Sequence, residues 1–115
     1  MKNVFSVLIL AVLIGSCGMM NKGESVKQTV TIQTNAQCGD CKERIEKELN
    51  FMTGIVYAEL DLVTKKVTVK YSSKRTSPEE IKKRISKIGY DADDVKAEIT
   101  AQAELPKCCQ PGGHD

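Results

Sequence analysis

The sequence contains no tryptophan and few aromatic residues of any kind, with two phenylalanines and three tyrosines among 115 residues. Proteins that bind single-stranded nucleic acids stack the bases on aromatic side chains, and this chain offers no such platform. Its charge is nearly balanced, since 17 basic and 15 acidic residues are mixed along the chain. Because no basic field is present to hold a phosphate backbone, we exclude nucleic acid as a partner.

Histidine is almost absent, and His114 is the only one in the chain. The sequence shows no Ser/His/Asp set, no glycine-rich phosphate loop and no paired carboxylates in a recognisable site. These are the groups that general acid–base and nucleophilic catalysis require. We therefore predict a binding protein and not an enzyme.

The apolar run at the N-terminus is too short to cross a membrane. It extends from Val4 to Ile14 with one polar interruption at Ser6, whereas a spanning helix needs about 20 apolar residues. A short apolar run that follows a single charge, here Lys2, is typical of a signal peptide. We assign residues 1–16 to this signal peptide.

The end of this run, Ile14-Gly15-Ser16-Cys17, resembles the lipobox of bacterial lipoproteins. The resemblance implies that Cys17 carries a lipid and becomes the first residue of an extracytoplasmic, membrane-anchored protein, on the periplasmic side or at the cell surface. Residues 17–26, with two glycines and no periodicity, are then a flexible linker. The alternative is ordinary signal-peptidase cleavage nearby, which leaves Cys17 as an unmodified thiol.

The rest of the chain alternates between strand-like and helix-like periodicity. Ser77-Pro78-Glu79-Glu80 is a strong helix start, and Gly89 is a strong helix stop. The predicted order is strand 27–34, helix 39–50, a hairpin of strands 56–62 and 67–71, helix 77–88 and strand 95–99. This order predicts the α+β class and a ferredoxin-like βαββαβ sandwich over residues 27–99, a four-stranded antiparallel sheet with two helices on one face.

Two cysteines, Cys38 and Cys41, lie between the first predicted strand and the first predicted helix. We expect Cys38 on the loop and Cys41 in the first helical turn. The positive end of the helix dipole favours thiolate over thiol, so we expect lowered cysteine pKa values there. A pair of thiolates on such a loop is suited to capturing a soft metal ion.

Several stretches of the chain resemble the heavy-metal-associated domain of copper chaperones, copper-transporting P-type ATPases and the periplasmic mercury-binding protein. The resemblance covers about residues 27–99. It rests on Cys38-Gly39-Asp40-Cys41, Gly54-Ile55, Leu60-Asp61, Lys65-Lys66-Val67-Thr68-Val69 and Ile88-Gly89-Tyr90-Asp91-Ala92. It implies that Cys38 and Cys41 bind the ion, usually Cu(I), and that Tyr90 lies close to the site. One departure is Asn35-Ala36 where the family usually has Gly-Met, from which we expect a looser loop.

Thiolate pairs suit ions that accept low coordination numbers, so the expected order is Cu(I) first, Hg(II) second and Zn(II), which prefers four ligands, third. The function predicted is that of a metallochaperone or scavenger that passes the ion to a metal-transporting ATPase or efflux component. Two alternatives remain open at this point. The same cysteines can serve as a thiol–disulfide redox pair, or the fold can be an interaction module without metal.

The last residues, 100–115, contain two prolines and two glycines, which predicts a flexible tail without regular structure. This tail carries a second group of soft ligands, Cys108, Cys109 and His114. They are candidates for additional ligands of the Cys38/Cys41 site or for a separate site. The alternative is that the adjacent cysteines oxidise or have no role.

Overall fold

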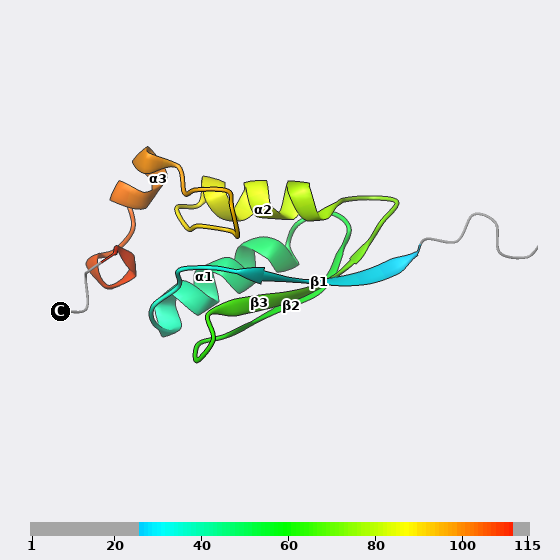
Figure 1. Ribbon diagram of the computed structural model, residues 1–115, viewed down its shortest axis with the longest axis horizontal. Coiled ribbons are helices and arrows are strands. Elements are labelled where there is room, and N and C mark those ends of the chain that lie inside the picture. Colours follow the sequence, from blue (N-terminus) through cyan, green and yellow to red (C-terminus); the bar gives the residue numbers. More distant parts are fainter. Residues whose placement is uncertain (1–25, 112–115) are drawn as a thin grey trace, which may run out of the picture.

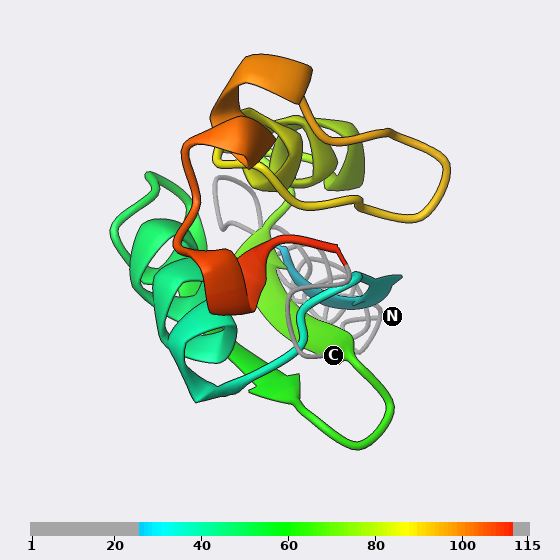
Figure 2. The ribbon, with the colours of Figure 1, turned by 90° about the vertical axis from the view of Figure 1, so that its left-hand side faces the viewer.

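The computed structural model describes residues 26–111, which form a three-stranded antiparallel sheet and a layer of helices. The strands are β1 (Lys27–Gln33), β2 (Ile55–Asp61) and β3 (Lys66–Ser72), in the order β1-β3-β2. The two long helices, α1 (Gly39–Asn50) and α2 (Pro78–Lys87), lie on the same side of this sheet (Figures 1 and 2). The α+β class, the hairpin and the two helices on one face are thereby confirmed.

Alternating side chains of the strands build the core. On the central strand β3, Val67, Val69 and Tyr71 are buried, and Ile32 of β1 and Leu60 of β2 join them. Burying an aliphatic side chain of this size contributes about 1.5–3 kcal/mol. This apolar face is what the two helices cover.

The helices begin and end where their sequences indicate. In α2, the Ser77 hydroxyl accepts a hydrogen bond from the Glu80 backbone N–H at 3.2 Å, and Pro78 occupies the first helical position. Gly89 follows the helix with a φ of +105°, a conformation that an L side chain rarely adopts. In α1, the buried residues Cys41, Ile45 and Leu49 recur every four positions and face the sheet.

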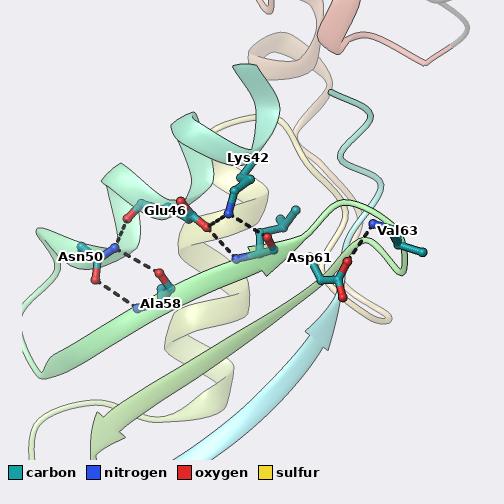
Figure 3. A network of polar contacts seen from close by, with 7 residues as sticks. Lys42, Glu46, Asn50, Ala58, Asp61 and Val63 are labelled. Carbon is teal, nitrogen blue, oxygen red and sulfur yellow. Dashed lines mark hydrogen bonds and ion pairs between the residues drawn. The ribbon is translucent and has the colours of Figure 1, made fainter. Parts of the chain in front are cut away.

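Polar side chains of α1 cover the open edge of β2 (Figure 3). The Glu46 carboxylate accepts a hydrogen bond from the Leu60 backbone N–H at 2.7 Å, and Lys42 Nζ donates to the Leu60 carbonyl at 2.9 Å. One turn later, Asn50 exchanges hydrogen bonds with both backbone groups of Ala58. These side chains therefore satisfy backbone hydrogen-bonding groups of an edge strand, which would otherwise be available for pairing with a strand of another chain.

The prediction of a fourth strand at 95–99 is wrong, because the described residues form no strand there. Only an isolated bridge between Thr34 and Ala92 continues the sheet beyond β1. The chain then reverses in a tight turn, in which Asp93 has a φ of +53° and Ala92 and Val95 exchange backbone hydrogen bonds of 2.9 Å. The Glu98 N–H donates to the Ser86 carbonyl at the end of α2, so this segment is directed away from the edge of β1.

Residues 99–110, which we term the C-terminal arm, are not the irregular tail that the prolines and glycines suggested. They contain the helix α3 (Ile99–Ala103) and the 3-10 helix η2 (Lys107–Cys109). Leu105 and Cys109 of the arm are buried in the domain core. Figure 2 shows η2, in red, close to the N-terminal end of α1, where the predicted metal loop lies.

Some of the expected features lie outside the described residues. These are the signal peptide at 1–16, most of the linker at 17–26 with Cys17, and His114. Among residues 26–111, no helix is long and apolar enough to cross a membrane.

Candidate metal centre

The loop between β1 and α1 places the first two cysteines at the start of a helix. Cys38 is the N-cap residue of α1, with extended backbone angles, and its carbonyl accepts the first helical hydrogen bond from Lys42 N–H at 3.0 Å. Cys41 lies in the first turn. Their Sγ atoms are 3.5 Å apart. Cys38 is half-buried, whereas Cys41 is completely buried.

The C-terminal arm brings two more thiols to this loop. Cys108 Sγ lies 3.6 Å and Cys109 Sγ 4.0 Å from Cys38 Sγ, and the two arm sulfurs are 3.9 Å apart. The sulfurs of Cys38, Cys108 and Cys109 thus form a compact group capable of holding a metal ion. All of these separations exceed the ~2.05 Å of a disulfide bond.

Burial of Cys41 overturns the expectation of a lowered pKa. Its desolvation raises the pKa of the Cys41 thiol to about 11, and the neighbouring Cys109 thiol adds to the increase. Backbone hydrogen bonds from Gln37 and Cys38 oppose the shift but do not outweigh it. The helix end stabilises a thiolate only where solvent or a counter-ion helps to carry the charge, and at Cys41 the apolar surroundings dominate.

The arm thiols also have raised pKa values. For Cys109 the main cause is burial, and for Cys108 it is the contact with the Cys38 thiol. The Cys108 thiol also donates to a carboxylate oxygen of Asp40 at 3.7 Å. Cys41, Cys108 and Cys109 therefore favour the protonated form, and a metal ion that binds to their sulfurs has to displace protons.

Tyr90 lies directly behind these thiols. It is completely buried, and burial together with the nearby Cys109 and Cys41 thiols raises the pKa of its hydroxyl. Among the described residues, its Oη atom has no well-formed hydrogen-bond partner. A neutral hydroxyl in this position is a ready donor for a sulfur that becomes charged.

Three polar residues, two in the loop and one in the first turn of α1, hold this region in place, and the sequence alone had given none of them a role. Asn35 Oδ1 accepts a hydrogen bond from the Asp91 backbone N–H at 2.9 Å, and Gln37 Nε2 donates to the Gln110 carbonyl at 2.8 Å. Asp40 contacts Cys108, as described above. The partners of all three are more than 50 residues away in the sequence, so no local pattern could have revealed them.

Ala36, which departs from the usual family pattern, is completely buried in the core. Its N–H donates to Thr34 Oγ1 at 3.1 Å, and the Thr34 hydroxyl in turn donates to the Lys65 carbonyl at 2.7 Å. The position thus keeps the buried character that a methionine would have. The expectation of a looser loop stays a prediction.

The β1–loop–α1 arrangement with two clustered cysteines is that of a metal-binding module, and a family comparison agrees. The model of the heavy-metal-associated domain matches residues 31–91, more than half of the chain. This protein belongs to the heavy-metal-associated domain family.

Curated relatives include copper-exporting P-type ATPases. The enzyme of Staphylococcus saprophyticus is 43% identical over 70 residues, which cover 59% of this chain and 9% of the ATPase. That of Staphylococcus aureus strain JH9 is 37% identical over 84 residues, covering 70% of this chain and 10% of the ATPase. The chain thus spans about a tenth of the length of these relatives.

Solved structures share the fold. The CopZ metallochaperone superimposes with a TM-score of 0.55 at 27% identity, covering 56% of this chain and 98% of its own. The water-soluble region of the P-type ATPase CopA from Bacillus subtilis superimposes with a TM-score of 0.56 at 33% identity, covering 60% of this chain and 46% of its own. Oxidized MerP from Ralstonia metallidurans CH34 superimposes with a TM-score of 0.57 at 22% identity, covering 59% of this chain and 96% of its own. This last similarity shows the common fold alone.

Proposed function

We propose that this protein binds Cu(I) through Cys38 and Cys41 and passes it on by ligand exchange. The observation that supports this most directly is the 3.5 Å separation of the two sulfurs at the start of α1, in a chain of the heavy-metal-associated family. Thiolate ligands select soft ions, of which Cu(I) accepts two ligands. The ion is cargo in this role, and no reaction is catalysed.

The geometry of the pair indicates how the cargo enters. With bonds of about 2.3 Å, the length of a zinc–thiolate bond, a linear two-thiolate site needs sulfurs about 4.6 Å apart. The sulfurs lie 3.5 Å apart, so binding requires a movement of about 1 Å or a bent arrangement. Cys38 is the residue suited to move, because it caps the helix on a half-buried loop, while Cys41 is packed in the core.

The names of the relatives support copper as the cargo. The curated relatives cited above are copper exporters, and CopZ is a metallochaperone. Mercury is the second choice, and Zn(II) is the third because two thiolates leave two of its four positions to other ligands. Transfer to a copper-transporting ATPase fits the exchange chemistry, since an incoming thiolate can enter a two-coordinate site before an old one leaves.

We place the protein outside the cytoplasm, anchored in a membrane by a lipid on Cys17. The signal-like run that ends at Ile14 and the lipobox-like residues before Cys17 support this location. A role there is capture or delivery of copper at the membrane surface, as metallochaperone or scavenger.

A thiol–disulfide redox role has weaker support from the site. Reactive thiols of redox proteins have lowered pKa values, whereas the pKa values of Cys41, Cys108 and Cys109 are raised. Turnover of a model disulfide by the reduced protein would favour this second role.

The test is an anaerobic Cu(I) titration of the full chain in the presence of a competing chelator. All samples carry Cys17→Ser, so that only the four cysteines near the loop titrate. We expect tight one-to-one binding that is lost when Cys38→Ser and Cys41→Ser are combined. Equal copper retention by this double variant would refute the proposed site and favour an interaction module without metal.

A further inference from the structure

The C-terminal arm reaches the metal loop through contacts that do not involve its thiols. Directly before the arm, the Glu98 N–H donates to the Ser86 carbonyl at 3.0 Å, and within the arm Leu105 is inserted in the core with 7% of its surface exposed. Gln110 closes the arm, because its side chain donates to the Leu105 carbonyl at 2.8 Å and its own carbonyl accepts from Gln37. The arm cysteines are therefore positioned by the fold and do not depend on a bound ion.

The three sulfurs of Cys38, Cys108 and Cys109 form a triangle with sides of 3.6, 4.0 and 3.9 Å. The point equidistant from all three lies about 2.2 Å from each, which is close to the ~2.3 Å of a metal–thiolate bond. A trigonal ion consequently fits this triangle with almost no rearrangement. The Cys38/Cys41 pair, in contrast, has to open before it can hold a linear ion.

A three-thiolate Cu(I) site at this triangle has a net negative charge, and the positive end of a helix lies beside it. Three thiolates and Cu(I) together carry two negative charges, and the carboxylate of Asp40 lies near Cys108. The N-terminal end of α1, a helix of 12 residues capped by Cys38, provides a positive dipole end against this charge. On binding, the three thiols release three protons to solvent, and no electrons are transferred.

We infer that Cys38, Cys108 and Cys109 form a three-thiolate site for a single Cu(I) ion when the arm is docked on the loop. This rests on the proposed function, because Cys38 belongs to both ligand sets: the Cys38/Cys41 pair holds the ion when the arm is away from the loop, and the three-thiolate set holds it when the arm is docked. The arm thiolates then occupy the coordination position that a partner's incoming thiolate would use. The arm retains the copper, and transfer requires the arm to leave the loop.

The experiment combines copper K-edge X-ray absorption with chelator competition on the reduced full chain, carrying Cys17→Ser throughout and loaded with one equivalent of Cu(I). The variants are Cys41→Ser, Cys108→Ser and Cys108→Ser combined with Cys109→Ser. Cys108 is half-buried, so its single substitution spares the core if the double variant fails to fold. Lys107→Ser, on the exposed side of the same 3-10 helix, is the matched control.

We expect three sulfur ligands for the parent chain, for Cys41→Ser and for Lys107→Ser, and two for both arm variants. Loss of an outer-shell partner already weakens metal sites about 10–100-fold, so loss of a ligand should weaken copper binding at least as much. Copper transfer to the chelator should become faster in the arm variants.

One set of results would overturn the three-thiolate site and leave the proposed function standing. In that set, the parent chain has two sulfur ligands, the arm variants bind copper with unchanged affinity, and Cys41→Ser loses binding. More than one copper ion per chain, or four sulfur ligands, would overturn the three-thiolate site as well. Binding that survives the combined Cys38→Ser and Cys41→Ser substitutions with unchanged affinity would refute both.

Discussion

Gln37 Nε2 donates a 2.8 Å hydrogen bond to the carbonyl of Gln110, joining the metal loop to a residue 73 positions later in the chain. A hydrogen bond of this kind contributes about 1 kcal/mol, which is about a fivefold change in an opening equilibrium. We therefore expect Gln37→Ala to expose Cys109, which is only 2% accessible, about five times more often. Alkylation rates of Cys109, followed by peptide mapping, measure this.

The control for Gln37→Ala is Lys47→Ala on the exposed side of α1, which should leave the alkylation rate of Cys109 unchanged. An identical rate in Gln37→Ala and the parent chain would show that the arm is held by its other contacts.

Gly89 allows the arm to approach α2 closely. A Cβ at this position would lie 3.1 Å from backbone atoms of Ala101 and Gln102, and the φ of +105° disfavours any side chain. We expect Gly89→Ala to lower the free energy of unfolding by about 1–3 kcal/mol. Urea denaturation measures this.

Gly39→Ala is the matched control for Gly89→Ala, because a Cβ there meets nothing within 4 Å and the residue is helical. Alanine should stabilise this position by up to about 1 kcal/mol. Equal destabilisation by both substitutions would contradict the role of close approach at Gly89.

Tyr90 carries a buried hydroxyl that, among the described residues, has no well-formed hydrogen-bond partner, although it lies beside the Cys41 and Cys109 thiols. An unsatisfied buried group costs about 1–3 kcal/mol, so Tyr90→Phe should leave the metal-free protein equally stable or more stable. Copper affinity should fall in the same variant, because the hydroxyl is positioned to donate to a charged Cys41 or Cys109 sulfur. Unfolding curves and chelator competition separate the two effects, and Tyr57→Phe on exposed β2 serves as reference.

The raised pKa of Cys41 predicts a loss of stability at high pH. Since folding raises this pKa from about 9 to about 11, the folded state favours the neutral thiol. The contribution to stability is complete below pH 9 and is lost as the pH rises to about 11, amounting to at most about 3 kcal/mol. Urea midpoints of the reduced protein between pH 8 and 11 test this, and Cys41→Ala should show a flatter profile. A parallel decline in both proteins would assign the pH dependence to other groups.

The two acidic residues of α1 at positions 43 and 46 should differ in importance. Glu46 accepts from Lys42 at 2.5 Å and from the Leu60 N–H at 2.7 Å, which ties α1 to the edge of β2 (Figure 3). We expect Glu46→Ala to cost about 1–2 kcal/mol of unfolding free energy, and Glu43→Ala, on the exposed face, to change it by less than about 0.5 kcal/mol. Thermal unfolding of the two variants compares them directly, and equal shifts would speak against the edge contact.

Predictions from sequence succeeded where one segment contains its own signal. Alternation of apolar residues defined β3, and the spacing of Cys41, Ile45 and Leu49 defined α1. The predicted strand at 95–99 failed because a few alternating apolar residues are weak evidence. The turn at Asp93 and the bond from Glu98 to α2 direct this segment elsewhere.

The sequence by itself determined the order along the chain of the three strands and the two long helices. It also determined the caps of α2 and the presence of two cysteines at the start of α1. These features could be read from the sequence because periodicity and capping are properties of neighbouring residues. Only the tertiary structure decided that Cys108 and Cys109 lie within 4.0 Å of Cys38 and that the pKa of Cys41 is raised. Both depend on burial and on contacts between residues about 70 positions apart. Such contacts arise when the whole core packs, and no local pattern encodes them.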